Sequence, residues 1–175
     1  FINYKGKPIL LHSIQKAKKT SKFKIILLVI NKRDKKKIKK MKLDNIKIIE
    51  GGKSRAESSF KAIKYLKKYN ISKVLIHDAA RPNFSLNLVN KLLQNLKKNE
   101  CVIPALKSTD STKLKKKNNI FNLNRDEILL TQTPQAFQYK QLYNLQKNLN
   151  INATDDASLF VRNKQKIKFI NGEEK

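Results

Sequence analysis

The chain has 175 residues, of which 39 % are hydrophobic and 30 % charged, with a formal net charge of +27. This composition predicts a soluble globular protein with a real hydrophobic core. It excludes a bilayer span, because the longest apolar run, residues 25–30, is far too short, and it excludes an intrachain disulfide, because Cys101 is the only cysteine. No signal-peptide pattern opens the chain, so we expect a cytoplasmic protein, or one in a plastid-type organelle lumen, with no membrane partner.

The positive charge has two explanations. A basic nucleic-acid-binding protein would use dense lysine and arginine to neutralise phosphates, with a steep salt dependence. However, only five of the 40 basic residues are arginine, and the abundance of lysine, asparagine and isoleucine together is typical of A/T-rich codons. The lysines are also spread through every expected helix. We therefore expect no nucleic-acid partner, although the charge should attract anionic ligands such as nucleotides.

Apolar runs alternate with amphipathic stretches along the chain. The runs predict strands at residues 24–30, 46–49, 73–77, 101–106 and 167–170. The amphipathic stretches predict helices at residues 9–20, 33–41, 55–69, 86–98, 139–148 and 155–162. Such alternation favours an α/β fold, in which a mostly parallel sheet carries helices on both faces.

Residues 109–124 interrupt this alternation. They are polar, rich in lysine at positions 115–117, and flanked by short alternating runs, which predicts a projecting β-hairpin or arm. Projecting arms are often dimerisation devices, although a surface loop would fit the same pattern. With no internal repeat and no Pro/Gly linker, residues 1–175 are expected to form a single domain.

The segment after the third expected strand carries the first candidate site. Asp78 follows an apolar run and is followed by two alanines, Arg81 and Pro82. Ligands of open parallel sheets bind outside the carboxyl ends of the strands, where a carboxylate can hold Mg²⁺ and, through it, a triphosphate. Taken alone, Asp78 could equally be a helix cap.

A second candidate is the run of residues 51–59. Gly51 and Gly52 let backbone approach a ligand closely, and Ser54 and Glu57 have the spacing of a capping box, so a helix should begin there. Its free N–H groups favour anions, and Ser58 lies one turn in. An ordinary tight turn between strand and helix is an equally good local interpretation.

Two further polar strings follow. Residues 124–126 and 131–135 bring hydroxyl, amide and guanidinium groups together, as a phosphorylated polyol would require. In residues 154–158, Thr154 has the character of an N-cap followed by two acids, and capping explains that string completely. No histidine–cysteine cluster has metal-ligand spacing, and Cys101 is expected in the core.

Taken in order, these strings resemble the 2-C-methyl-D-erythritol 4-phosphate cytidylyltransferases of the non-mevalonate isoprenoid pathway. The most specific matches are His77-Asp78-Ala79-Ala80-Arg81-Pro82 and Gln132-Thr133-Pro134-Gln135, and the resemblance covers essentially the whole chain. It implies a Rossmann-like three-layer sandwich, a homodimer joined through the β-arm, and transfer of CMP from CTP to the polyol phosphate with release of pyrophosphate.

The resemblance also implies roles for individual residues. It assigns Asp78 to Mg²⁺, and Gly52, Ser58, Ala79 and Arg81 to the cytidine moiety of CTP. The polyol phosphate side would be formed by Ser111, Arg125, Thr133 and Thr154, with Arg125 reaching across the dimer. Arg125 and Thr133 are the residues expected to act in catalysis, and Ser111 replaces the family's usual threonine.

The resemblance leaves two matters open. The family has a Gly-rich phosphate loop before the point that matches Phe1 and a catalytic lysine after the point that matches Lys175, so we expect the chain as given to be inactive and its full-length parent to be active. A ribitol-5-phosphate cytidylyltransferase and a bifunctional enzyme fused to a cyclodiphosphate synthase are the alternative readings of the same motifs.

Overall fold

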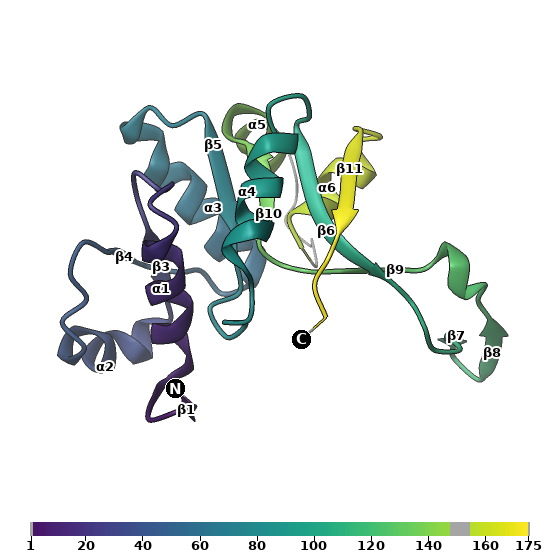
Figure 1. The fold of residues 1–175 in the computed structure, drawn as a ribbon, viewed down its shortest axis with the longest axis horizontal. Helices are drawn as coiled ribbons and strands as arrows, with labels where there is room; N and C mark the ends of the chain where they lie inside the picture. Colours follow the sequence, from purple (N-terminus) through teal and green to yellow (C-terminus); the bar gives the residue numbers. More distant parts are fainter. Residues whose placement is uncertain (1, 148–154, 175) are drawn as a thin grey trace.

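The computed structural model describes residues 2–147 and 155–174, and its elements form a layered α/β fold with one projecting arm (Figure 1). The main sheet has the strand order β11-β6-β10-β5. Its strands are β5 (Lys73–Ile76), β6 (Cys101–Lys107), β10 (Gln135–Gln138) and β11 (Ile167–Asn171). A further strand, β9 (Leu129–Thr131), pairs antiparallel with the end of β6.

Most of this sheet runs in one direction. β11 pairs parallel with β6, whereas β10 lies antiparallel to both β5 and β6, so β5, β6 and β11 point the same way. The expected α/β fold class with a mostly parallel sheet is therefore confirmed. β10 is the central strand that the sequence did not predict, because it is short and begins and ends with glutamine.

Two smaller sheets precede the main one. β3 (Leu27–Ile30) and β4 (Lys47–Glu50) form a parallel pair, and β1 (Asn3–Tyr4) and β2 (Lys7–Pro8) form a short antiparallel pair. β3 is shorter than its apolar run of residues 24–30 predicted. Within the described residues, β3 pairs only with β4 and β5 pairs only with β10, so β3 and β4 stay apart from the main sheet.

Helices occupy the positions that the amphipathic stretches predicted, each somewhat shorter than expected. They are α1 (Ile9–Lys19), α2 (Lys35–Lys40), α3 (Arg55–Leu66), α4 (Leu86–Asn95), α5 (Tyr139–Lys147) and α6 (Ala157–Arg162). Single 3₁₀ turns flank three elements: η1 (Lys32–Asp34), η2 (Lys67–Tyr69) and η3 (Arg125–Glu127).

The core lies on both faces of the main sheet. Successive residues of a strand point to opposite faces, so Phe137 joins one hydrophobic cluster while its neighbour Ala136 joins the other. α3, α5 and α6 cover the first cluster, in which the rings of Phe137 and Phe160 stack at 5.5 Å between centroids. α4 covers the second cluster through Leu88 and Leu92. This arrangement is the expected three-layer sandwich.

Cys101 belongs to the first core cluster and is fully buried, as expected. Burial raises the pKa of its thiol to about 12, and the nearby Asp155 carboxylate contributes in the same direction. The thiol is therefore protonated and enclosed at neutral pH, which confirms a structural role rather than a reactive one.

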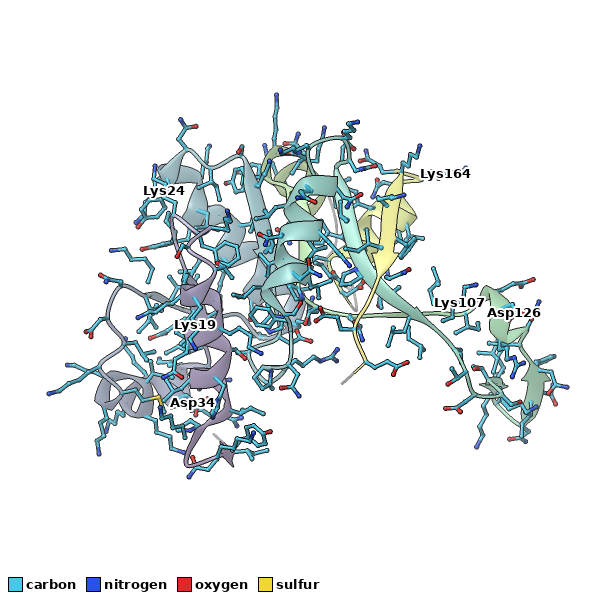
Figure 2. All side chains as sticks on the ribbon, in the orientation of Figure 1. Lys19, Lys24, Asp34, Lys107, Asp126 and Lys164 are labelled. Atoms are coloured by element: carbon cyan, nitrogen blue, oxygen red, sulfur yellow. The ribbon has the colours of Figure 1, made fainter. Side chains whose placement is uncertain are left out.

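The arm is a hairpin of β7 (Lys113–Lys116) and β8 (Asn119–Asn122), which extends away from the rest of the protein (Figure 1). All eight residues of its two strands are exposed. Lysines surround the whole protein: Lys19, Lys24, Lys107 and Lys164 lie on separate parts of it (Figure 2). Among the described residues, no helix is long and apolar enough to cross a membrane.

Candidate functional site

The loop after β5 places Asp78 at the carboxyl edge of the main sheet. The Arg81 N–H donates to the Asp78 carbonyl at 2.9 Å, which closes a tight turn. The Asp78 N–H donates to the hydroxyl of Thr133 at 3.3 Å, and Thr133 is buried in the segment that joins β9 to β10. The Ser13 hydroxyl of α1 donates to the carbonyl of Ala79 at 2.7 Å. Two separate segments, α1 and the connection from β9 to β10, therefore hold this loop where α/β sheets bind ligands.

Two guanidinium groups flank the Asp78 carboxylate. Arg81 Nε lies 3.3 Å from Asp78 Oδ2, and Arg55 Nε lies 3.9 Å from Asp78 Oδ1. All three side chains are partly exposed, so their charges face solvent at the sheet edge. Paired guanidinium groups bind phosphate oxygens in a bidentate manner, so this edge favours a phosphorylated ligand.

The start of α3 lies beside Asp78 and has the predicted cap. The Ser54 hydroxyl accepts from the Glu57 N–H at 3.1 Å, and the Glu57 carboxylate accepts from the Lys53 N–H at 2.7 Å. The Lys53 N–H and then Lys61 lower the pKa of Glu57. The helix boundary predicted from the Ser54–Glu57 spacing is therefore confirmed.

Gly51 and Gly52 allow close packing of α3 against β4. A Cβ at Gly51 would lie 2.5 Å from Ser58 Oγ, and one at Gly52 would lie 2.3 Å from Cδ of Glu57. The glycines thus make room for the first turn of α3 itself, a role that the sequence did not distinguish from ligand approach. Ser58 Oγ in turn accepts from the Gly52 N–H at 2.9 Å and donates to the Ser54 carbonyl at 2.8 Å.

The two acids of residues 154–158 have different roles: Asp155 caps a helix, and Asp156 is a buried carboxylate in an ion pair. Asp155 Oδ1 accepts from the Ser158 N–H at 2.9 Å, so Asp155 caps α6. Asp156 is 2 % exposed and makes no cap hydrogen bond; its Oδ2 pairs with Arg55 Nη1 at 2.9 Å. The expectation that capping explains the whole string is therefore wrong for Asp156. Thr154 lies outside the described residues.

A partly buried hydrogen-bond network joins the segment after β9 to Glu173, near the end of the described residues. The Gln132 amide donates to the Glu173 carbonyl at 2.8 Å and accepts from the Glu173 N–H at 2.9 Å. The Glu173 carboxylate accepts from the N–H of Ser85 at 2.9 Å and also from its hydroxyl. Ser85 caps α4, so this network fixes the segment after β11 against the sheet.

Ser111 and Arg125 lie on or beside the arm and are exposed. Arg125 Nη1 donates to the Thr109 carbonyl at 3.4 Å, a contact within the arm region. In Figures 1 and 2 the arm, including the labelled Asp126 next to Arg125, extends away from β5. Within one chain, Arg81 and Thr133 contact Asp78 directly, Ala79 follows it, and Ser58 lines the same cavity as Asp78, with Gly52 bonded to its hydroxyl. Ser111 and Arg125 do not line that cavity.

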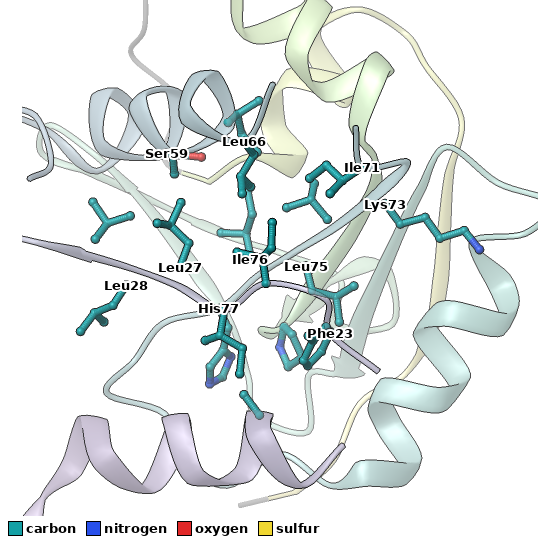
Figure 3. Close-up of a pocket in the computed structure, with 18 of the residues that line it drawn as sticks. Phe23, Leu27, Leu28, Ser59, Leu66, Ile71, Lys73, Leu75, Ile76 and His77 are labelled. Carbon is teal, nitrogen blue, oxygen red and sulfur yellow. The ribbon is translucent and has the colours of Figure 1, made fainter. Parts of the chain in front are cut away.

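A cavity of about 690 Å³ lies between β3 and β5 (Figure 3). Its interior is apolar, with Leu27, Leu66 and Ile76 among its lining residues. Polar side chains line it as well: Ser13, Arg55, Ser58 and Asp78 belong to the site already described, and Lys22, Lys24 and Lys73 are further members of the lining. A charged nucleotide phosphate would be stable beside such polar groups and not in the apolar interior, because burying an ion there carries a large desolvation cost.

The sheet edge offers few carboxylate ligands for a Mg²⁺ ion. Among the described residues, no three His, Cys, Asp or Glu side chains gather as a complete metal site. Asp78 offers one partly exposed carboxylate. Mg²⁺ commonly takes one or two carboxylates and completes its octahedron with water and substrate phosphates. The donor set therefore fits an ion that binds together with a triphosphate.

Comparisons with known proteins agree with this geometry. The family model described as 2-C-methyl-D-erythritol 4-phosphate cytidylyltransferase, IspD, matches residues 1–175. A bifunctional IspD/IspF enzyme of Pelagibacter ubique is 58 % identical over 173 residues, which cover 99 % of this chain and 47 % of the relative. The chain thus spans about half the length of that relative. A 2-C-methyl-D-erythritol 4-phosphate cytidylyltransferase of Clostridium beijerinckii is 32 % identical over 91 % of this chain and 74 % of its own length.

Solved structures give the same result. The 4-diphosphocytidyl-2C-methyl-D-erythritol synthase of Anaerococcus prevotii superposes with a TM-score of 0.89 at 33 % identity, covering 99 % of this chain and 80 % of that one. The bifunctional IspDF of Campylobacter jejuni superposes with a TM-score of 0.82 at 33 % identity, covering 96 % and 42 %.

Proposed function

The chain belongs to the 2-C-methyl-D-erythritol 4-phosphate cytidylyltransferase family, and on that premise we propose that the protein transfers CMP from CTP to 2-C-methyl-D-erythritol 4-phosphate. An oxygen of the polyol phosphate forms a bond to the α-phosphorus of CTP, the bond from that phosphorus to the β-phosphate oxygen breaks, and pyrophosphate leaves. The observation that carries the proposal is the Asp78 carboxylate between Arg55 and Arg81, next to the start of α3.

We propose that Gly52, Ser58, Ala79 and Arg81 contact the cytidine moiety. The Ser58 hydroxyl donates its proton to Ser54 and accepts from Gly52, so only one acceptor position remains on its oxygen. An amino group such as the 4-amino group of cytosine can donate to that position, whereas the 4-carbonyl of uracil cannot. This inventory supports CTP over UTP as the nucleotide substrate.

We propose that Asp78 holds a Mg²⁺ ion that enters with CTP. When bound, this ion supplies positive charge that stabilises the triphosphate and the developing charge on pyrophosphate. The guanidinium groups of Arg55 and Arg81 add charge on the same edge, and Thr133 orients the loop through its hydrogen bond to the Asp78 backbone.

We propose that the polyol phosphate side is completed by a second copy of the chain. Ser111 and Arg125 stand apart from Asp78 in one chain, and exposed apolar residues of the arm, Leu114, Ile120 and Phe121, offer a surface for a partner arm. In such a homodimer Arg125 of one subunit would bind the polyol phosphate in the other, beside Thr133 and Thr154. The proposed organisation is one nucleotidyltransferase domain over residues 1–175 with a dimerisation arm, in a reducing compartment such as the cytoplasm.

Sedimentation velocity over a range of concentrations tests the dimer. The double variant Ile120→Lys/Phe121→Lys should sediment as a monomer where the unmodified chain is a dimer, because two added charges oppose burial of the arm. Leu86→Lys is the matched control, since Leu86 is an exposed apolar residue on α4, outside the arm. A monomeric unmodified chain at every concentration would overturn this part of the proposal.

Calorimetric binding and product analysis test the function. The chain should bind CTP in the presence of Mg²⁺ at least about tenfold more tightly than UTP, as loss of one well-placed hydrogen bond would predict. Product analysis of the full-length parent protein by mass spectrometry, with 2-C-methyl-D-erythritol 4-phosphate and ribitol 5-phosphate supplied separately, identifies the acceptor. The proposal fails if the chain binds neither nucleotide, or if the protein forms product from ribitol 5-phosphate alone.

A further inference from the structure

Asp156 is a buried carboxylate that the proposed reaction does not use. It comes from the segment before α6, and its side chain is 3 % exposed. Three donors surround it: the Ser59 hydroxyl at 2.6 Å and the Gln146 amide at 2.9 Å on Oδ1, and Arg55 Nη1 at 2.9 Å on Oδ2. Gln146 also donates to Ser59 Oγ at 2.9 Å, which ties the network together. Its donors come from α3 and α5, so the cluster forms only in the folded chain.

Arg55 joins this buried network to the exposed site. Its Nη1 contacts Asp156 at 2.9 Å, whereas its Nε lies 3.9 Å from Asp78 Oδ1, too far for a hydrogen bond. The two carboxylates therefore compete for one guanidinium, and Asp156 holds the shorter contact. The hydrogen bond to Asp156 uses one of the five N–H donors of Arg55, which leaves donors for an oxyanion at the open end of the cavity.

Removing Asp156 would change which carboxylate Arg55 binds. An arginine released from a buried partner pairs with the nearest carboxylate, and a bidentate pair with Asp78 is the strongest arrangement open to it. That pair would occupy both oxygens of Asp78 and turn the remaining N–H groups of Arg55 away from the triphosphate. The site would lose an open carboxylate and an available guanidinium together.

We propose that Asp156 is a positioning residue that keeps Arg55 off Asp78 and directs its guanidinium toward the nucleotide phosphates. Ser59 and Gln146 fix the Asp156 side chain by donating hydrogen bonds to its other oxygen, Oδ1. This inference rests on the proposed nucleotide site but concerns residues that lie behind it. It assigns to Asp156 a role that helix capping does not require, since Asp155 already caps α6.

The test compares Asp156→Asn with Asp155→Asn. Both changes remove one charge from the same segment and disturb a hydrogen bond near α6, but only the first releases Arg55. The direct readout is the arginine Nε–H region of a ¹⁵N–¹H spectrum of the chain, which holds only five signals because there are five arginines. The Arg55 signal, assigned through Arg55→Lys, should be rigid in the unmodified chain and in Asp155→Asn. In Asp156→Asn it should shift or broaden.

The second readout is calorimetric binding of CTP with Mg²⁺ to the same three folded proteins. Asp156→Asn should weaken binding about tenfold, equivalent to one lost charge-assisted contact, while Asp155→Asn stays within about twofold. The losses of CTP affinity in Asp156→Asn and Arg55→Lys should not add up in the double variant, because both substitutions remove the same contact. Asp156→Glu, which keeps the charge, should recover part of the affinity.

The outcomes separate the two levels of inference. If the unmodified chain does not bind CTP, the proposed function fails, while the arginine spectrum still decides whether Asp156 holds Arg55. If CTP binds but Asp156→Asn leaves both the Arg55 signal and the affinity unchanged, the positioning role is overturned alone. Equal effects of Asp155→Asn and Asp156→Asn would reduce Asp156 to a structural role and also overturn the inference.

Discussion

The edge around Asp78 and the arm both present charged residues to solvent, but they hold them by different means. At the edge, residues of the body hold two of the charged groups: Thr133 bonds to the Asp78 backbone and Asp156 to Arg55. On the arm, Arg125 donates to the Thr109 carbonyl of its own region, and both hairpin strands are exposed. The first region is preorganised within a single chain, whereas the second would be fixed only in the proposed dimer.

The comparison is strongest for folding stability. Phe137→Ala removes a fully buried ring that stacks on Phe160 and should lower the free energy of unfolding by about 3–5 kcal/mol. Phe121→Ala on the arm should change it by less than about 0.5 kcal/mol in dilute, monomeric protein. Urea denaturation measures both. A comparable loss for the two variants would show that the arm is part of the folded body and end the distinction.

Substitutions at the Asp78 edge and on the arm should also differ in their effect on enzyme activity. Asp78→Asn should reduce Mg²⁺-dependent pyrophosphate release by the full-length protein at least about 100-fold, because it removes the charge that holds the ion. The unfolding temperature should change little, since the Asp78 side chain is partly exposed. Asp126→Asn, the same substitution on the arm, is the control and should remain active. Survival of activity in Asp78→Asn would refute the metal role.

Arg125→Ala should have a smaller and more selective effect. Loss of one charge-assisted contact predicts about tenfold weaker use of the polyol phosphate, with affinity for CTP unchanged. Mixing Arg125→Ala subunits with Asp78→Asn subunits should restore activity in part, because each mixed dimer contains one intact site. No recovery on mixing, with dimers demonstrably exchanged, would place Arg125 in the site of its own chain.

The smallest effect concerns Cys101. Because burial raises the pKa of its thiol to about 12, from an ordinary value of 9.0, a thiol reagent at pH 8 should not label the folded chain but should label it rapidly in urea. The raised pKa contributes stability that is complete below pH 9.0 and is lost as the pH rises toward 12. The unfolding temperature of Cys101→Ala, measured at several pH values, should therefore fall less steeply between pH 9.0 and 12 than that of the unmodified chain. Labelling of the native chain would contradict the buried position.

The sequence predicted the parts of this structure that depend on local patterns. Apolar runs located β5, β6 and β11, and the Ser54–Glu57 spacing located the start of α3. β10 was missed because Gln135 is polar yet 2 % exposed, and its amide reaches Asp155, which no periodicity reveals. The ion pair of Arg55 with Asp156 was missed for a similar reason, since the two residues are 101 positions apart in the sequence.

The pair of guanidinium groups beside Asp78 also shows how a biased composition can mark a site. Only five of the 40 basic residues of this chain are arginine, and a guanidinium group forms bidentate contacts that an ammonium group cannot form. Two of the five flank one carboxylate, and a third lies on the arm. In other proteins with a similar nucleotide bias, the few arginines therefore indicate candidate binding sites better than the many lysines do.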